Sequence, residues 1–129
     1  MKKTIMTLLL LVGGMTLAMA QKPAQIKFDE TSHNFGTFSK SEGKVSYTFT
    51  YTNVGEQPLV INRVMATCGC TVYDYTKEPT QPGEKGEVKI TYNTNRGNAG
   101  HFKKNITVQT NGAVEISRLY IEGDMTDDK

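Results

Sequence analysis

Two cysteines, Cys68 and Cys70, are the only thiols of this 129-residue chain, and a single glycine, Gly69, separates them. Alternate residues of a β-strand point to the same face, so a strand would hold the two Cβ atoms about 6–7 Å apart on one surface. A disulfide needs Cβ atoms about 3.5–4.5 Å apart. The chain must therefore bend if the two thiols are to bond, and Gly69 is predicted to support that bend because glycine is the most permissive residue.

A disulfide across this spacing contributes little to stability. The loop-entropy relation gives about 1.6 kcal/mol for a loop of three residues, and departures from relaxed disulfide geometry cost several kcal/mol. Four interpretations of Cys68 and Cys70 stay open. In the first, they pack as small apolar groups at a strand end, and in the second, they form a strained disulfide that cycles with a partner. In the third, they hold a soft metal ion, and in the fourth, they act as intermolecular or nucleophilic thiols.

A soft-metal site at Cys68 and Cys70 would need further donors. His33, His101 and Met65 are the weak candidates that the sequence offers. Structural zinc prefers four ligands in paired Cys/His motifs, whereas copper(I) is satisfied by two or three soft ligands. The prediction is therefore no cofactor, with copper(I) as the alternative.

Other catalytic constellations are absent from the sequence. A Cys–His nucleophile would need His33 or His101 beside a cysteine and a third group to orient the imidazole, and nothing local supplies them. Serine-elbow, zinc-protease, phosphate-loop and calcium-loop patterns do not occur. We predict a non-enzymatic protein whose one enzymatic alternative is thiol–disulfide chemistry.

Two tyrosines follow the thiols, in the stretch TVYDYTKEP that leads into a loop. Loops at the ends of β-sandwiches often carry binding function, and an exposed tyrosine combines apolar area with a hydroxyl. Tyr73 and Tyr75 are therefore a candidate binding surface, with ordinary structural tyrosines as the alternative.

The first twenty residues have the pattern of a cleavable signal peptide, with a basic start, an interrupted apolar run and Ala18-Met19-Ala20 before the break. Removing Lys2 and Lys3 with this segment lowers the 15 Lys and Arg residues to 13, which equals the 13 Asp and Glu residues. A neutral chain has no basic footprint for nucleic acid or an anionic membrane. We predict a periplasmic or secreted protein without stable membrane insertion, whose partner is a protein or a cell-envelope component.

The elements that position these residues are short strands separated by turns. Over 44–53, Val45, Tyr47, Phe49 and Tyr51 alternate with polar residues, which predicts a half-buried strand. Further strands are expected in QIKF, LVINRVMATC, EVKITYN, HFKKNITVQ and AVEISRLYIEG. Because no segment has a sustained helical period, the sequence predicts an all-β fold, an Ig-like antiparallel β-sandwich of about seven strands.

Three connections carry local predictions. The Asn34 to Gly36 segment is expected to form a turn, and Asn111-Gly112 favours a tight primed hairpin turn. In the last strand the apolar phase changes after Ile116, so a bulge near Ser117-Arg118 is expected to bring both halves to the core face.

The segments HNFGTF, YTFTYTNVGEQPLVINRV, CGCT, EPTQPGEKGEVKITYN and GHFKKNITVQTN follow one another in a distinctive order. This order resembles the bacterial secreted Ig-like domains of unknown function that carry a Cys-Gly-Cys-Thr motif, and more distantly the ASH, hydin and PapD-like sandwiches. The resemblance covers residues 26–123 and implies an exported Ig-like module with no established activity. The predicted organisation is a signal peptide at 1–20, an Ig-like domain at 21–123 and a flexible polar tail at 124–129.

Overall fold

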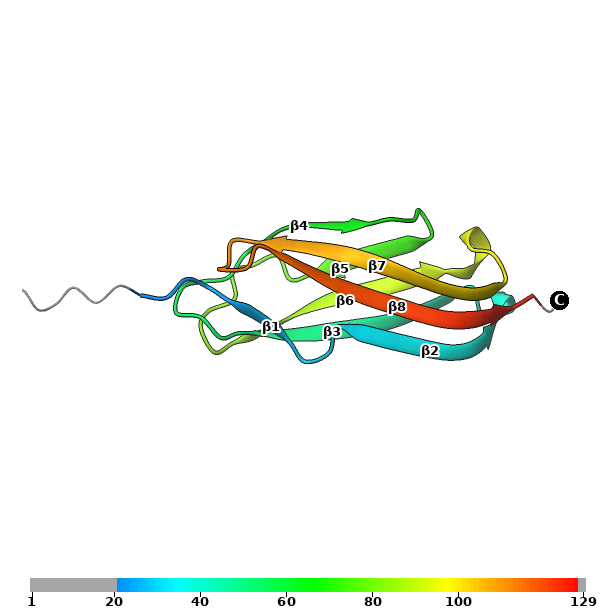
Figure 1. Ribbon diagram of the computed structural model, residues 1–129, viewed down its shortest axis with the longest axis horizontal. Coiled ribbons are helices and arrows are strands. Elements are labelled where there is room, and N and C mark those ends of the chain that lie inside the picture. The colour runs from blue at the N-terminus through cyan, green and yellow to red at the C-terminus, as the bar shows by residue number, and fades with distance from the viewer. Residues whose placement is uncertain (1–20, 128–129) are drawn as a thin grey trace, which may run out of the picture.

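The computed structural model describes residues 21–127, so the predicted signal peptide at 1–20 lies outside the described residues. Within them, the chain forms two packed four-stranded sheets (Figure 1). The elements in chain order are β1 (Ile26–Phe28), β2 (Ser32–Ser39), the 3₁₀ turn η2 (Lys40–Glu42), β3 (Lys44–Asn53), β4 (Ile61–Ala66), β5 (Thr71–Tyr75), β6 (Lys85–Asn93), the 3₁₀ turn η3 (Thr94–Arg96), β7 (Gly100–Thr110) and β8 (Ile116–Thr126). No helix in this part of the chain has the length and apolar character needed to cross a bilayer.

The two sheets differ in how their strands run. The first sheet has the order β1-β3-β6-β5 and every pair in it is antiparallel. The second has the order β2-β8-β7-β4, in which β2 lies parallel to β8 and the other pairs are antiparallel. The predicted all-β, Ig-like sandwich is confirmed, with eight strands in residues 21–127 and one parallel pair.

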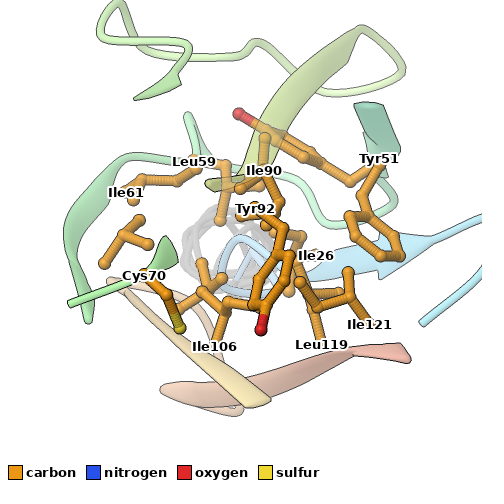
Figure 2. Packing of buried hydrophobic residues seen from close by; sticks show 14 of the residues in the cluster. Ile26, Tyr51, Leu59, Ile61, Cys70, Ile90, Tyr92, Ile106, Leu119 and Ile121 are labelled. Atoms are coloured by element: carbon orange, nitrogen blue, oxygen red, sulfur yellow. The ribbon is translucent and has the colours of Figure 1, made fainter. Parts of the chain in front are cut away.

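The core lies between the sheets, where alternate residues of each strand face inward (Figure 2). The strand predicted over 44–53 is confirmed as β3, and its residues Phe49 and Tyr51 are each 1% exposed. Ile106 and Leu119, which pair across β7 and β8, are fully buried on the opposing sheet. Burial of side chains of this size stabilises the fold by about 1.5–3 kcal/mol each.

Pairing between β7 and β8 contains no bulge. The register is unbroken along the whole pair, so the bulge predicted near Ser117-Arg118 is wrong. Val114 and Ile116 are 55% and 40% exposed, and as surface residues they need no change of phase to reach the core. β8 continues to Thr126 because Met125 is buried, and it thereby includes the first three residues of the segment assigned to the polar tail.

The segment from Asn34 to Gly36 lies inside β2 as an irregularity. Gly36 has a φ of 74°, and its N–H donates to Asn34 Oδ1 at 2.7 Å. Pairing with β8 shifts in register between Asn34 and Thr37. The turn chemistry read from the sequence therefore bends the strand without ending it.

Asn111 fixes the loop between β7 and β8 in a way that the sequence did not predict. Asn111 does not have positive φ, since no non-glycine residue in 21–127 does, and Gly112 is not among the glycines with positive φ. Both primed turn types need positive φ at the first central residue, so the predicted primed turn is wrong. Asn111 Oδ1 instead accepts from the Val60 N–H at 2.9 Å, and its Nδ2 donates to the Pro58 carbonyl at 3.1 Å. The side chain thus joins two loops.

A buried asparagine closes the same end of the sandwich. Asn53 has no solvent exposure. Its Nδ2 donates to the carbonyls of Gln57 and Thr80 at 2.7 and 2.9 Å, and its Oδ1 accepts from the N–H groups of Gly55 and Gln25 at 2.9 and 3.3 Å. We call this region the Asn53 end, and it comprises the loops at residues 54–60, 76–84 and 111–115.

Candidate functional site

The segment Cys68–Cys70 forms the turn that carries the chain from β4 in the second sheet to β5 in the first. The Thr71 N–H donates to the Cys68 carbonyl at 3.2 Å, and the Asn93 N–H at the end of β6 donates to the Cys70 carbonyl at 2.7 Å. This turn lies at the same end of the ribbon as the C-terminus, opposite the Asn53 end (Figure 1). Backbone hydrogen bonds therefore hold the turn in addition to any bond between the sulfurs.

A disulfide joins Cys68 to Cys70, with their Cα atoms 5.2 Å apart. Cys70 is 2% exposed and its sulfur points into the core that also contains Tyr92 and Ile106 (Figure 2). Cys68 is only half-buried, and its Sγ accepts a hydrogen bond from the Cys70 N–H at 3.1 Å. The structure thus contains the bonded state that the redox interpretation requires, while Cys70 also packs as a small apolar group.

Gly69 does not support this turn through a glycine-specific conformation. Its φ lies outside the left-handed region, and no atom beyond its chain neighbours would lie within 4 Å of an added Cβ. The sequence argument placed the cysteines at the end of a strand, where closing the gap requires an unusual bend. In the structure they lie in a turn where the chain reverses without a left-handed glycine, and the support of this bend by Gly69 stays a prediction.

A groove of about 340 Å³ opens beside the disulfide. We call it the disulfide groove. It is lined by the Cys68–Cys70 turn, by the end of η3 with the residues after it, and by the start of β7. Two buried rings on its core side, Tyr92 and Phe102, stack in parallel with centroids 4.1 Å apart. The groove therefore has a rigid aromatic base, and the disulfide is part of its lining.

Basic side chains line the disulfide groove without any carboxylate. The basic residues are Arg96, His101, Lys103 and Lys104. Within residues 21–127 the ion pairs are Lys77 with Asp74 and His101 with Asp124, so Arg96 and Lys104 have no acidic partner in this part of the chain. The Lys103 ammonium lies over the Tyr120 ring. Arg96 and Lys104 are thus the unpaired cations of the groove.

Lys104 and Gly97 are site residues that sequence reasoning missed. Lys104 follows Phe102 by two positions and precedes Ile106 by two, so it occupies an inward position of β7. A lysine in the apolar phase of a strand is a detectable signal, although it does not reveal what lies opposite. Gly97 shows no such signal: a Cβ there would overlap the Tyr92 hydroxyl, which reveals its role only in three dimensions.

Burial raises the pKa of Tyr92, because a phenolate would lose solvation in the core. The ring therefore stays neutral beneath the groove at physiological pH. The lysines and the arginine of the groove therefore have no phenolate opposing their positive charge.

Of the extra donors proposed for a metal, His101 lies in the groove with the cysteines. Its Nδ1 is 3.0 Å from Asp124 Oδ1. His33, predicted in a turn, lies in β2 and stacks on Tyr47 with ring centroids 3.7 Å apart, and Met65 is exposed on β4. Within residues 21–127 no group of three or more His, Cys, Asp or Glu residues is arranged to hold a metal ion. Copper(I) binding by the reduced thiols stays a prediction.

Tyr73 and Tyr75 belong to β5 and do not line the disulfide groove. They share one face of the strand, but their exposure differs. Tyr73 is 40% exposed, whereas Tyr75 packs against the core and carries the Lys77 ammonium 4.3 Å from its ring centroid. The sequence grouped two residues whose surroundings are different.

The edge of β7 beside the groove has no strand partner on one side. β4 pairs with β7 only along Ile106–Thr110 before it turns away at Cys68. Among the described strands, the segment Gly100–Asn105 of β7 therefore pairs with β8 alone. In an antiparallel pair, every second residue points its N–H and C=O away from the neighbouring strand. In Gly100–Asn105, these N–H and C=O groups face the side along which β4 no longer runs.

The family model described as "Protein of unknown function (DUF1573)" matches residues 26–125. The chain belongs to this family. The match confirms the resemblance drawn from the Cys-Gly-Cys-Thr order, and it carries no assigned activity. No curated protein matches the chain.

Solved structures share the fold of this DUF1573 domain at low identity. A protein of unknown function from Porphyromonas gingivalis W83 has a TM-score of 0.70 and 14% identity over 86% of this chain, which spans 51% of that protein. The ASH/PapD-like domain 7 of human CEP192 has a TM-score of 0.66 and 13% identity, with 92% of this chain and 97% of that domain covered. The VesB protease of Vibrio cholerae has a TM-score of 0.58 and 19% identity over 79% of this chain, which spans 32% of that protein. These likenesses establish the ASH/PapD-like sandwich and leave function to be argued from the site.

Proposed function

We propose that this DUF1573 domain is an exported binding module that holds an extended acidic segment of another protein in the disulfide groove. One observation carries the proposal. The free edge of β7 at Gly100–Asn105 and the unpaired cations Arg96 and Lys104 border the same groove.

The free edge of β7 supplies the backbone part of the interaction. An extended peptide can add to an exposed sheet edge and take its affinity from main-chain hydrogen bonds. The edge lies where β4 would continue if it did not turn at Cys68. A partner segment of about six residues would span Gly100–Asn105, since a strand rises about 3.3 Å per residue.

The two cations determine the sign of the partner's charge. Lys104 is half-buried, so its charge is less screened by solvent than that of an ordinary surface lysine. Arg96 presents a planar donor fork suited to a carboxylate. A segment with acidic side chains is therefore attracted to the groove, whereas a basic segment is repelled.

A pair of defined peptides tests this function. We expect a peptide of about eight residues that alternates glutamate and valine to shift the amide resonances of Gly100–Asn105 in an NMR titration of residues 21–129. The matched peptide with lysine in place of glutamate should leave them unchanged. Absence of shifts with the acidic peptide at millimolar concentration, or equal shifts with both peptides, would overturn the proposal.

Paired charge reversals locate the binding site. Arg96→Glu with Lys104→Glu should abolish the titration by the acidic peptide. Lys27→Glu with Arg118→Glu changes the net charge by the same amount at exposed positions outside the groove and should preserve binding. Equal loss in both double variants would show that net charge, rather than the groove, attracts the peptide.

A further inference from the structure

We infer that Cys68 is the exchanging sulfur of a thiol–disulfide pair and Cys70 its buried resolving partner, so that the groove forms a transient mixed disulfide with a cysteine of a bound protein. This inference shares the groove with the proposed function but depends on the sulfurs, which peptide binding does not require. It is therefore tested with small reagents that do not need the β7 edge.

The two sulfurs differ in their access to an incoming thiol. Cys68 is half-buried and lines the groove, whereas Cys70 is 2% exposed and belongs to the core. A thiolate must approach the sulfur that it attacks, so access selects Cys68. Cys70 then becomes the leaving sulfur.

The surroundings also favour a thiolate at Cys68 in the reduced protein. The Cys70 N–H donates to Cys68 Sγ at 3.1 Å, and Arg96 and Lys104 line the same groove. Hydrogen-bond donors and nearby cations both stabilise a thiolate. Asp124, the carboxylate beside His101 of the groove, is paired with that imidazole. Cys70 lies in apolar surroundings with the Thr71 hydroxyl 3.9 Å from its sulfur, so desolvation favours its neutral thiol.

Opening the disulfide does not require the fold to open. The turn keeps the hydrogen bonds from Thr71 to the Cys68 carbonyl and from Asn93 to the Cys70 carbonyl. β4 and β5 remain paired with β7 and β6. The pair can therefore move between disulfide and dithiol while the groove keeps its shape.

The exchange balances with a cysteine pair of the bound protein as the reductant. A partner thiolate attacks Cys68 Sγ, the bond between Cys68 and Cys70 breaks, and Cys70 leaves with the electron pair and takes up a proton. The second partner thiolate then attacks its neighbour's sulfur in the mixed disulfide and releases Cys68 as a thiolate. Two partner thiolates have become a disulfide, and two electrons have passed to the pair, which now consists of a Cys68 thiolate and a protonated Cys70 thiol. The reverse sequence reduces a partner disulfide.

Oxidised glutathione tests the order of the two sulfurs in residues 21–129, which contain the complete sandwich. In the reduced Cys70→Ser variant, we expect glutathione to remain attached at Cys68, which mass spectrometry detects. The reduced wild-type chain should end as the intramolecular disulfide with two released glutathione molecules, because Cys70 resolves the adduct. A wild-type chain that retains glutathione, or that does not react, would overturn the inference.

Single-cysteine alkylation rates compare the two thiols directly. Iodoacetamide, which is uncharged, should modify Cys68 in Cys70→Ser about tenfold faster or more than Cys70 in Cys68→Ser while both variants are folded. In guanidinium chloride the two rates should become equal. Equal rates in the folded variants would contradict the assigned roles even if both proteins bind the acidic peptide.

The pH dependence of Cys68 alkylation shows whether the groove cations stabilise the Cys68 thiolate, in addition to the accessibility of its sulfur. In the Cys70→Ser background, Arg96→Glu with Lys104→Glu should move the midpoint of Cys68 alkylation to higher pH. Lys27→Glu with Arg118→Glu should leave the midpoint unchanged. An unchanged midpoint in the groove variant would show that the cations do not act on Cys68.

Discussion

The loops at the two ends of this sandwich are held together by different chemical groups. At the Asn53 end, one fully buried amide makes four hydrogen bonds to the backbone of the surrounding segments. At the other end, a disulfide and two unpaired cations surround an open groove. We therefore expect stability to be concentrated at the Asn53 end, which leaves the groove end free to carry the disulfide and the charged groups.

Removing the buried amide should have the largest effect on stability. Asn53→Ala leaves the carbonyls of Gln57 and Thr80 and the Gly55 N–H without their side-chain partner. We expect the free energy of unfolding to fall by about 3 kcal/mol, since each buried group left unsatisfied costs about 1–3 kcal/mol. Urea denaturation followed by circular dichroism measures it, and a loss below about 1 kcal/mol would contradict the comparison.

Reducing the disulfide should have a smaller effect, although it breaks a covalent bond. The loop closed by Cys68 and Cys70 contains three residues, so its entropic contribution is at most about 1.6 kcal/mol. Urea denaturation of the wild-type chain with and without a phosphine reductant measures the loss. The same reductant applied to the Cys68→Ser, Cys70→Ser double variant is the control and should change nothing. A loss above about 3 kcal/mol would show that the disulfide is a structural staple.

Asn111→Ala should cost about 1 kcal/mol. Its two hydrogen bonds, to the Val60 N–H and the Pro58 carbonyl, are exposed, so water replaces them in part when the side chain is removed. Asn62→Ala on the exposed side of β4 is the matched control, with an expected change within about 0.5 kcal/mol. Equal effects of the two substitutions would show that the hydrogen bonds of the Asn111 side chain do not stabilise the Asn53 end.

Gly69→Ala should have the smallest effect, within about 0.5 kcal/mol, because space is open around the position. Mass spectrometry after alkylation should still find the disulfide. Gly97→Ala is the contrasting variant at the same end, since its Cβ would overlap the Tyr92 hydroxyl, and we expect it to cost about 1–3 kcal/mol. A large loss of stability in Gly69→Ala would show that the bend between the cysteines requires glycine.

Local patterns in the sequence predict local structure well and fail where a contact joins distant segments. The alternation of apolar and polar residues over 44–53 predicts β3, because the polarity of each side chain indicates whether that side chain is buried. The spacing of Cys68 and Cys70 shows that a disulfide between them would be a weak staple. The parallel pairing of β2 with β8 leaves no local pattern, since it depends on which strand arrives beside β2.

The candidate site was predictable only in its cysteines and His101. Arg96 is the last residue of η3, and Lys104 lies in β7, so their place beside the thiols depends on how β4 crosses between the sheets. His33 and Met65 were equally plausible donors by residue type and lie elsewhere. Residue type identifies candidates for chemistry, but the topology selects which of them meet.

The parallel pair of β2 and β8 also imposes an order on how the molecule is completed. Ser32, near the start of the domain, pairs with Tyr120, near its end. While the chain is being synthesised, β2 must wait for the last strand before its edge is paired. Until then, β2 lacks the neighbour that completes the sheet around Phe35 and Phe38, which pack against the core in the finished fold. A chaperone that covers β2 during synthesis would therefore protect this domain from aggregation more than a chaperone that covers a later strand.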